Sequence, residues 1–199
     1  WSSVVCSSDL RVVARSLCHI ARIHMGRGHF EDASDAATEA VGICDQIDER
    51  WTGAEARLVH GEVHAASGQY RQAMQQWEQA MVLATEVGDR FRRVELLLLQ
   101  AETLIAMGEW QQASTLMLGV ADQTRDMGDP ELASGLFRVQ AAIQLERQAL
   151  EAAERDSERA VQVAQESGAR LAVARAELVQ ACVLGTRADR KSTRLNSSH

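Results

Sequence analysis

Residues of the same kind return every 40 positions along most of this chain. Large side chains and alanines recur in this way, at Phe30, Tyr70, Trp110 and Leu150 and at Ala33, Ala73, Ala113 and Ala153. Glycine forms two further columns, at Gly28, Gly68 and Gly108 and, half a repeat away, at Gly88, Gly128 and Gly168, while Gln148 interrupts the first of them. A fixed period of this length is typical of a stacked array of repeats.

Each repeat reads as a pair of antiparallel helices. Apolar residues recur at spacings of three and four, and glycine-centred breaks come about every 20 residues. The content of 46% hydrophobic but only 4% aromatic residues, with one proline, also favours helices. We expect an all-α fold whose odd-numbered helices (A) alternate with even-numbered ones (B), over 10–25, 30–47, 52–66, 70–87, 90–107, 110–127, 130–145, 150–167 and 170–184.

Small residues mark the places where helices cross closely. A second column holds only alanine and glycine, at Ala21, Gly61, Ala101, Ala141 and Ala181. Larger side chains in it or in the alanine column would push the backbones apart.

The clearest helix start is Asp129 followed by Pro130, because the carboxylate can accept from a free amide and proline loses no hydrogen bond there. Trp77 is expected to fill the core rather than form a binding ridge on the B helices.

The pattern of a small residue at 21, an alanine at 33 and a small residue at 40, repeated except at Val120, resembles the tetratricopeptide repeat. The match covers most of residues 11–188, although the repeat has 40 residues rather than 34. It implies a right-handed α-solenoid of about four and a half repeats, over 11–50, 51–89, 90–129, 130–168 and the half repeat 169–188. The Gly88-Asp89 and Gly128-Asp129 repeat ends resemble those of bacterial regulators, namely LuxR-type ATP-dependent transcriptional activators and sensors with cyclase domains.

In the tetratricopeptide family the A helices line a concave groove that holds a partner peptide or domain. The resemblance carries this role to Arg15, Cys18, Arg22, Glu55, Leu58, Glu62, Glu95, Leu98, Glu102 and Arg138. The four glutamates predict an acidic patch with the two leucines between the charges. Such a patch would hold a basic amphipathic segment, since opposite charges steer encounter and apolar contacts supply affinity. The alternative is an ordinary solvated face.

Three functions are compatible with an α-helical repeat protein of this kind. The first is a protein interaction scaffold within a larger bacterial signalling or transcriptional regulator, and the second is a stand-alone adaptor. The third is an enzyme with a metal site at His24, His60 and His64 and with Cys18 as a further ligand. The run HGEVH at 60–64 lacks the HExxH order of zinc proteases, and no phosphate loop or nucleophile motif appears. We therefore expect no catalytic residue, metal or cofactor.

The two ends of the chain lack the period. Residues 1–10 and 189–199 are rich in serine, and a nucleotide sequence that encodes the second has a reverse complement that encodes nearly all of the first. That nucleotide sequence resembles an adapter of short-read sequencing libraries, so both ends are interpreted as artefacts and set aside.

The net charge limits the kinds of partner that this chain can bind, and the cysteine content indicates its cellular compartment. The ends hold three basic and two acidic residues, so a net charge of −7 becomes −8 without them. A phosphate backbone requires a basic face, and this segment is expected not to bind nucleic acid. Cys18, Cys44 and Cys182 form no CxxC pair, which suits a reducing compartment. No signal peptide or membrane span is visible, and we expect a cytoplasmic protein that does not bind a membrane. Its expected partner is a protein or peptide, or another domain of the same full-length chain.

Overall fold

The structure is a computed structural model that describes residues 7–196, and within this range every regular element is an α-helix. The helices are α1 (Ser7–Gly26), α2 (Phe30–Gln46), α3 (Arg50–Ala66), α4 (Tyr70–Glu86), α5 (Arg90–Ala106), α6 (Trp110–Leu116), α7 (Val120–Met127), α8 (Pro130–Glu146), α9 (Leu150–Ser167) and α10 (Arg170–Asn196). They form two compact units whose boundary falls within α5, between Leu96 and Leu97.

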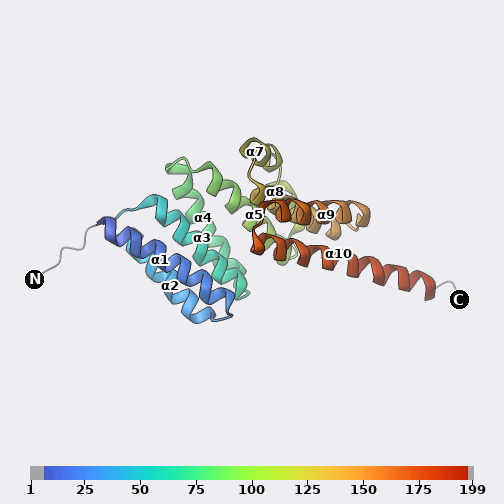
Figure 1. Ribbon diagram of the computed structural model, residues 1–199, viewed down its shortest axis with the longest axis horizontal. Helices are drawn as coiled ribbons and strands as arrows, with labels where there is room; N and C mark the ends of the chain where they lie inside the picture. Colours follow the sequence, from blue (N-terminus) through green and yellow to red (C-terminus); the bar gives the residue numbers. More distant parts are fainter. Residues whose placement is uncertain (1–6, 197–199) are drawn as a thin grey trace, which may run out of the picture. The chain divides into compact units, whose positions relative to one another are not determined.

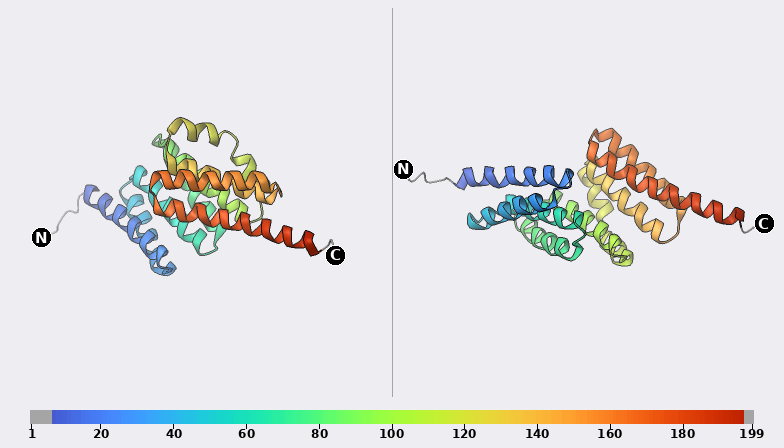
Figure 2. Two further views of the ribbon diagram at one scale, coloured as in Figure 1. Left: turned by 45° about the vertical axis from the view of Figure 1, so that its right-hand side comes forward. Right: turned by 90° about the horizontal axis from the view of Figure 1, so that it is seen from below.

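Within each unit, successive helices pack against one another. In the first unit α1 lies along α2, α2 packs on α3, and α3 packs on α4, while α1 also contacts α3, the next A helix (Figure 1). In the second unit α8 packs on α9 and α9 on α10, α8 contacts α10, and the short helices α6 and α7 contact α8 (Figure 2). This arrangement confirms the expected all-α solenoid of helix pairs.

The repeat columns mark the helix boundaries and the tight crossings. The B helices begin at Phe30 (α2), Tyr70 (α4), Trp110 (α6) and Leu150 (α9), the members of one column. The A helices are α1, α3, α5, α8 and α10, because the third B helix is divided into α6 and α7. The alanine column is completely buried, with no exposed surface at Ala33, Ala73, Ala113 or Ala153. Side chains without reach beyond Cβ let neighbouring helices approach closely, so the column sets the helix spacing.

Most helices end in the same left-handed turn. After α1, the amide of His29 donates to the carbonyl of His24 (2.9 Å), and Gly28 has a φ of 78°. Equivalent bonds close α3 and α5 at Gln69 and Glu109. Asp48 and Gln148 occupy glycine column positions and still have φ values of 52° and 63°. The turn is therefore imposed by the packed helices, because a non-glycine residue in this region is strained.

Carboxylate side chains cap the first turn of several A helices. The side chain of Asp129 accepts from the amide of Leu132 (2.9 Å), and Pro130 is the first residue of α8, as expected from the sequence. Asp89 caps α5 in the same way through the amide of Arg92 (2.9 Å). These caps satisfy amides that have no partner within the helix.

One expected helix is divided in two. The sequence predicts a single helix over 110–127, whereas α6 ends at Leu116 and α7 begins at Val120. Gly119 separates them with a φ of 80°, a conformation that interrupts the helical hydrogen bonds. Val120 is 1% exposed and stands where Ala40, Ala80 and Ala160 stand in the other repeats. The break lets this larger side chain enter a position that is otherwise reserved for alanine.

Gly61 and Trp77 form a complementary pair between α3 and α4. Trp77 is 1% exposed, and its indole N–H donates to the carbonyl of Leu58 (3.1 Å). A Cβ added at Gly61 would lie 2.2 Å from the indole nitrogen. The equivalent residues of the first repeat, Ala21 and Ala37, are both fully buried. The absence of a side chain on one helix thus makes room for the tryptophan on the other, which confirms its core position.

The segments interpreted as adapter-derived lie partly outside the described residues. Residues 1–6 and 197–199 are not described, while residues 7–10 begin α1 and residues 189–196 end α10.

Candidate functional site

The A helices of the first unit share a cluster of charged side chains. Arg22 on α1 contacts Glu62 and Glu55 on α3, with N to O distances of 3.3 and 3.5 Å. Arg92 on α5 contacts Glu95 on the same helix at 2.9 Å and Glu55 at 4.0 Å. Glu55 therefore links the two arginines across three A helices. These five residues are called the charged cluster below.

The charged cluster is largely withdrawn from water. The exposed fractions of its side chains are 11% for Glu62, 15% for Glu55 and Arg92, 29% for Glu95 and 32% for Arg22. At such depth each charge needs its partner, because loss of one member leaves another desolvated and uncompensated. Glu95 is the most exposed carboxylate of the cluster.

Burial also changes the ionisation of this cluster. It raises the pKa of the Glu95 carboxyl, and Glu62 adds to the effect while Arg92 opposes it. Burial alone would lower the pKa of the Arg22 guanidinium, but the Glu62 and Glu55 carboxylates outweigh it and raise that pKa. Cys18 is completely buried, and burial, reinforced by Glu55, raises the pKa of its thiol to about 12.

The expected acidic patch is only partly assembled. Glu55, Glu62 and Glu95 do lie together, but Arg22 and Arg92 are interleaved with them, so the group carries compensated charge rather than a bare acidic surface. Sequence reasoning missed Arg92 altogether. The sequence does set Arg92 apart, because it is the one charged residue in its repeat column. The equivalent residues are Val12, Thr52 and Leu132.

Leu58 and Leu98 do not line an open groove, and that expectation is wrong. They are 0% and 5% exposed. Leu98 packs beneath α8, where a Cβ at Gly135 would lie 3.1 Å from its Cδ1. The equivalent residues Cys18 and Arg138 are also buried, at 0% and 8%. This register position therefore packs between helices in all four repeats and does not face a partner.

In the second unit Arg138 forms an ion pair with Glu102. The guanidinium Nε of Arg138 on α8 donates to Glu102 Oε1 of α5 at 3.1 Å, and a second guanidinium nitrogen contacts the same oxygen. Arg138 occupies a column that is otherwise apolar, so Glu102 supplies the charge that its burial requires. Arg15, the remaining expected groove residue, lies exposed on α1.

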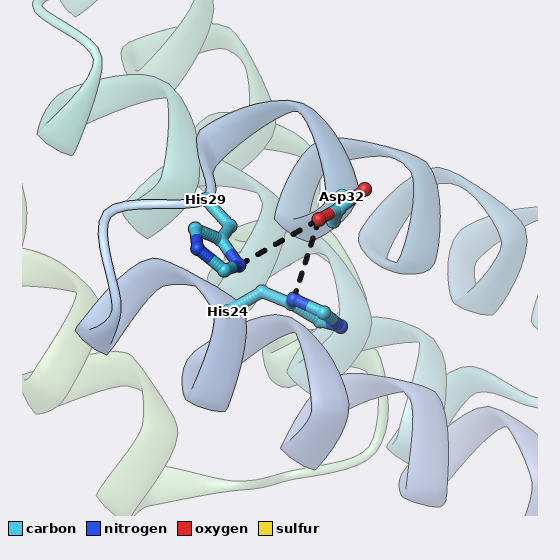
Figure 3. A group of neighbouring side chains, drawn as sticks. All are labelled: His24, His29 and Asp32. Atoms are coloured by element: carbon cyan, nitrogen blue, oxygen red, sulfur yellow. Dashed lines mark ion pairs between the residues drawn. The ribbon is translucent and has the colours of Figure 1, made fainter.

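The histidines do not gather as the metal hypothesis required. His60 and His64 stack on α3 with ring centroids 4.4 Å apart. Burial, together with His64 and Arg57, lowers the pKa of His60 to about 4. His24 lies instead beside His29 and Asp32 (Figure 3), and these three are the group of metal-ligating side chains that converges within the described residues. His60, His64 and Cys18 are not part of it.

Two surface hollows lie elsewhere. One, of about 690 Å³, is lined by residues of α2 and of the end of α3, among them Phe30, Asp35 and His64. The other, of about 400 Å³, lies among α7, α8 and α9 and includes Phe137, whose ring is stacked 4.8 Å from the Arg159 guanidinium. Neither is lined by a member of the charged cluster. Among the described residues, none of the helices combines the length and apolar character needed to cross a bilayer.

Comparison with known proteins yields a match in fold. We found no family model and no curated protein that matches this sequence. Among solved structures, BtubC (BKLC) from P. vanneervenii superposes with a TM-score of 0.69 over 96% of this chain and 84% of that chain, at 12% sequence identity. At this identity the similarity concerns the arrangement of the helices alone, and it supports the helix-pair fold described above.

Proposed function

We propose that this chain is a protein interaction scaffold of the tetratricopeptide type, a binding protein rather than an enzyme. The observation that carries the proposal is the charged cluster, a set of side chains held by ion pairs across three adjacent A helices. Side chains that are already ordered lose little conformational freedom when a partner binds, so such a face is suited to recognition.

The groups with altered ionisation support binding over catalysis. Glu95, Cys18 and His60 owe their pKa shifts mainly to burial between helices. None of the three lines either of the two hollows described above. Catalytic groups with perturbed pKa values usually converge on a cleft that admits a substrate.

The charged cluster holds three glutamates against two arginines, so its remaining charge is negative. The partner that fits this face best is therefore an amphipathic segment with basic side chains. Glu95 is accessible enough to accept from a lysine or arginine of the partner. Apolar contact comes from α1, where Val12 and Ile23 are 63% and 53% exposed. They lie on one stripe about three turns apart, beside the face that carries Arg15 and Arg22. Val12 and Ile23 thus replace Leu58 and Leu98 as the apolar component of the proposed binding face.

Photo-crosslinking tests which face binds. A photoreactive residue is placed at Arg15 on an A helix or at Glu78 on the B helix α4; both positions are exposed. Adducts with a partner protein are expected from position 15. Adducts formed mainly from position 78 would place the binding surface on the B helices and refute the proposal.

Peptide selection tests the chemistry of the partner. Peptides selected from a random library against the full chain are expected to be basic and amphipathic. Glu95→Gln should weaken their binding by about tenfold, the loss expected for a hydrogen bond to a charged group. Glu78→Gln makes the same change of charge on a B helix and should leave binding unchanged. Equal effects of the two variants would show that only net charge matters.

The setting of the interaction is part of the same proposal. The Gly-Asp repeat ends resemble those of LuxR-type and cyclase-linked bacterial regulators, so we place the scaffold in a cytoplasmic signalling or transcriptional regulator. The free thiols of Cys18, Cys44 and Cys182 support a reducing compartment. A stand-alone adaptor is the second candidate. Co-purification of the partner with a regulator that contains this segment would favour the first.

A further inference from the structure

The turn between α1 and α2 brings two histidines and an aspartate together. His24 lies in the last turn of α1, His29 directly precedes α2, and Asp32 lies in the first turn of α2. The backbone bond from the His29 amide to the His24 carbonyl (2.9 Å) closes this turn. The two imidazoles are thereby held with their centroids 6.0 Å apart, although five positions separate them in the sequence.

The three side chains point toward one another (Figure 3). Nδ1 of His24 lies 3.6 Å from an oxygen of Asp32, and Nδ1 of His29 lies 3.8 Å from the same oxygen. One ligand atom from each residue lies within 4.8 Å of the others. Bonds of about 2.0–2.2 Å in a tetrahedral site place ligand atoms about 3.4 Å apart, so only a small contraction is needed. His29 and Asp32 are exposed enough to make it, at 58% and 62% of the side chain.

We propose that His24, His29 and Asp32 bind a zinc ion. Imidazole nitrogen and carboxylate oxygen are zinc ligands, and a water molecule would complete the tetrahedron. A second observation supports a ligand here: Nδ1 of His24 is buried and, apart from the 3.6 Å contact with Asp32, has no hydrogen-bond partner. Buried polar atoms are rarely left in this state. A zinc ion would satisfy that nitrogen and join the end of α1 to the start of α2.

The next repeat shows how the same corner is built without a metal site. His64 is the equivalent of His24, and its Nδ1 lies 2.7 Å from the side-chain oxygen of Gln69, the equivalent of His29. Gln72 replaces Asp32 there. In the later repeats the three positions hold Leu104, Glu109 and Gln112, and then Gln144, Ala149 and Ala152. The His-His-Asp combination is thus specific to the first turn.

Zinc titration of the full chain tests the proposal. The protein is prepared without a polyhistidine tag, stripped of metal, and titrated with zinc against a chromophoric chelator. One equivalent is expected to bind, and the melting temperature should rise with zinc because the ion binds only the folded corner. His29→Gln and Asp32→Asn should each weaken binding by about tenfold or more. Both residues are exposed, so the fold should survive, which circular dichroism verifies.

His64→Gln is the matched control, since it changes the equivalent histidine of the second repeat. It should leave zinc affinity unchanged. Failure of the parent chain to bind zinc would overturn the proposal. So would affinity that is unaffected by His29→Gln and Asp32→Asn, or that is lost with His64→Gln, because the metal would then lie elsewhere.

Discussion

The pairing of Gly61 with Trp77 makes Gly61→Ala the most informative single change in the fold. Alanine is normally the better helix former, by about 1 kcal/mol in a helix interior. Here its Cβ would lie 2.2 Å from the nitrogen and 2.5 Å from a carbon of the Trp77 indole. No contact of that length is tolerated, so either the ring or the helices must move.

The expected cost follows from what that movement breaks. Overpacking of a core by one methyl costs about 1–3 kcal/mol. Displacing the ring also strands the indole N–H that donates to Leu58, which costs about 1–3 kcal/mol when the group stays buried. After the gain in helix propensity, Gly61→Ala should lower the free energy of unfolding by about 3 kcal/mol. With an m-value of about 2 kcal/mol/M, the urea midpoint falls by about 1.5 M.

Urea unfolding followed by circular dichroism measures this shift, and two further variants isolate its cause. Gly42 is exposed on α2 with no atom near its added Cβ, so Gly42→Ala should stabilise the protein by about 1 kcal/mol. In a Trp77→Ala background, Gly61→Ala reproduces the alanine pair of the first repeat and should also stabilise the protein. A loss of the same size with and without Trp77 would refute the steric explanation.

Three other experiments test separate features. Gln148→Gly should stabilise by about 1 kcal/mol because Gln148 holds a φ of 63°; an unchanged melting temperature would contradict the strain. Because the folded state keeps His60 neutral, it binds fewer protons than the unfolded state between pH 6.5 and about 4. Stability should therefore fall as the pH falls through that range, and His60→Gln should flatten the dependence of the urea midpoint on pH; an identical slope in the variant would contradict this. Iodoacetamide should label exposed Cys182 in the native protein and reach Cys18 only after unfolding, as peptide mapping by mass spectrometry would show; equal labelling would show that Cys18 is accessible.

Local signals explain why much of the fold could be predicted from the sequence. Helix starts such as Asp129-Pro130 and the glycine turns depend on a few adjacent residues. The alanine column depends only on the period. The break at Gly119 was missed because periodicity continues through it, and only the valine at position 120 signalled a local change.

The candidate site was less predictable because it depends on contacts between repeats. Arg22 and Glu55 are far apart in sequence and meet only when α1 packs on α3. Leu58 and Leu98 were placed on the surface by analogy with the family register, whereas their own column, with Cys18, already indicated a packing position. His29 and Asp32 could not be joined to His24 by helical spacing, because the turn between α1 and α2 brings the three side chains together.

The interruption between α6 and α7 also allows residues to be inserted into this part of the chain. Residues 117–119 stand outside both helices, and Leu118 is 78% exposed. An added segment there would interrupt only turn bonds, such as the one from the Val120 amide to the Met117 carbonyl (3.2 Å), and would displace no buried side chain. The same addition within α2 or α4 would shift every following residue by part of a turn. The third repeat is therefore the place where this array can accept an insertion, a reporter domain or a protease site while its helix pairs stay in register.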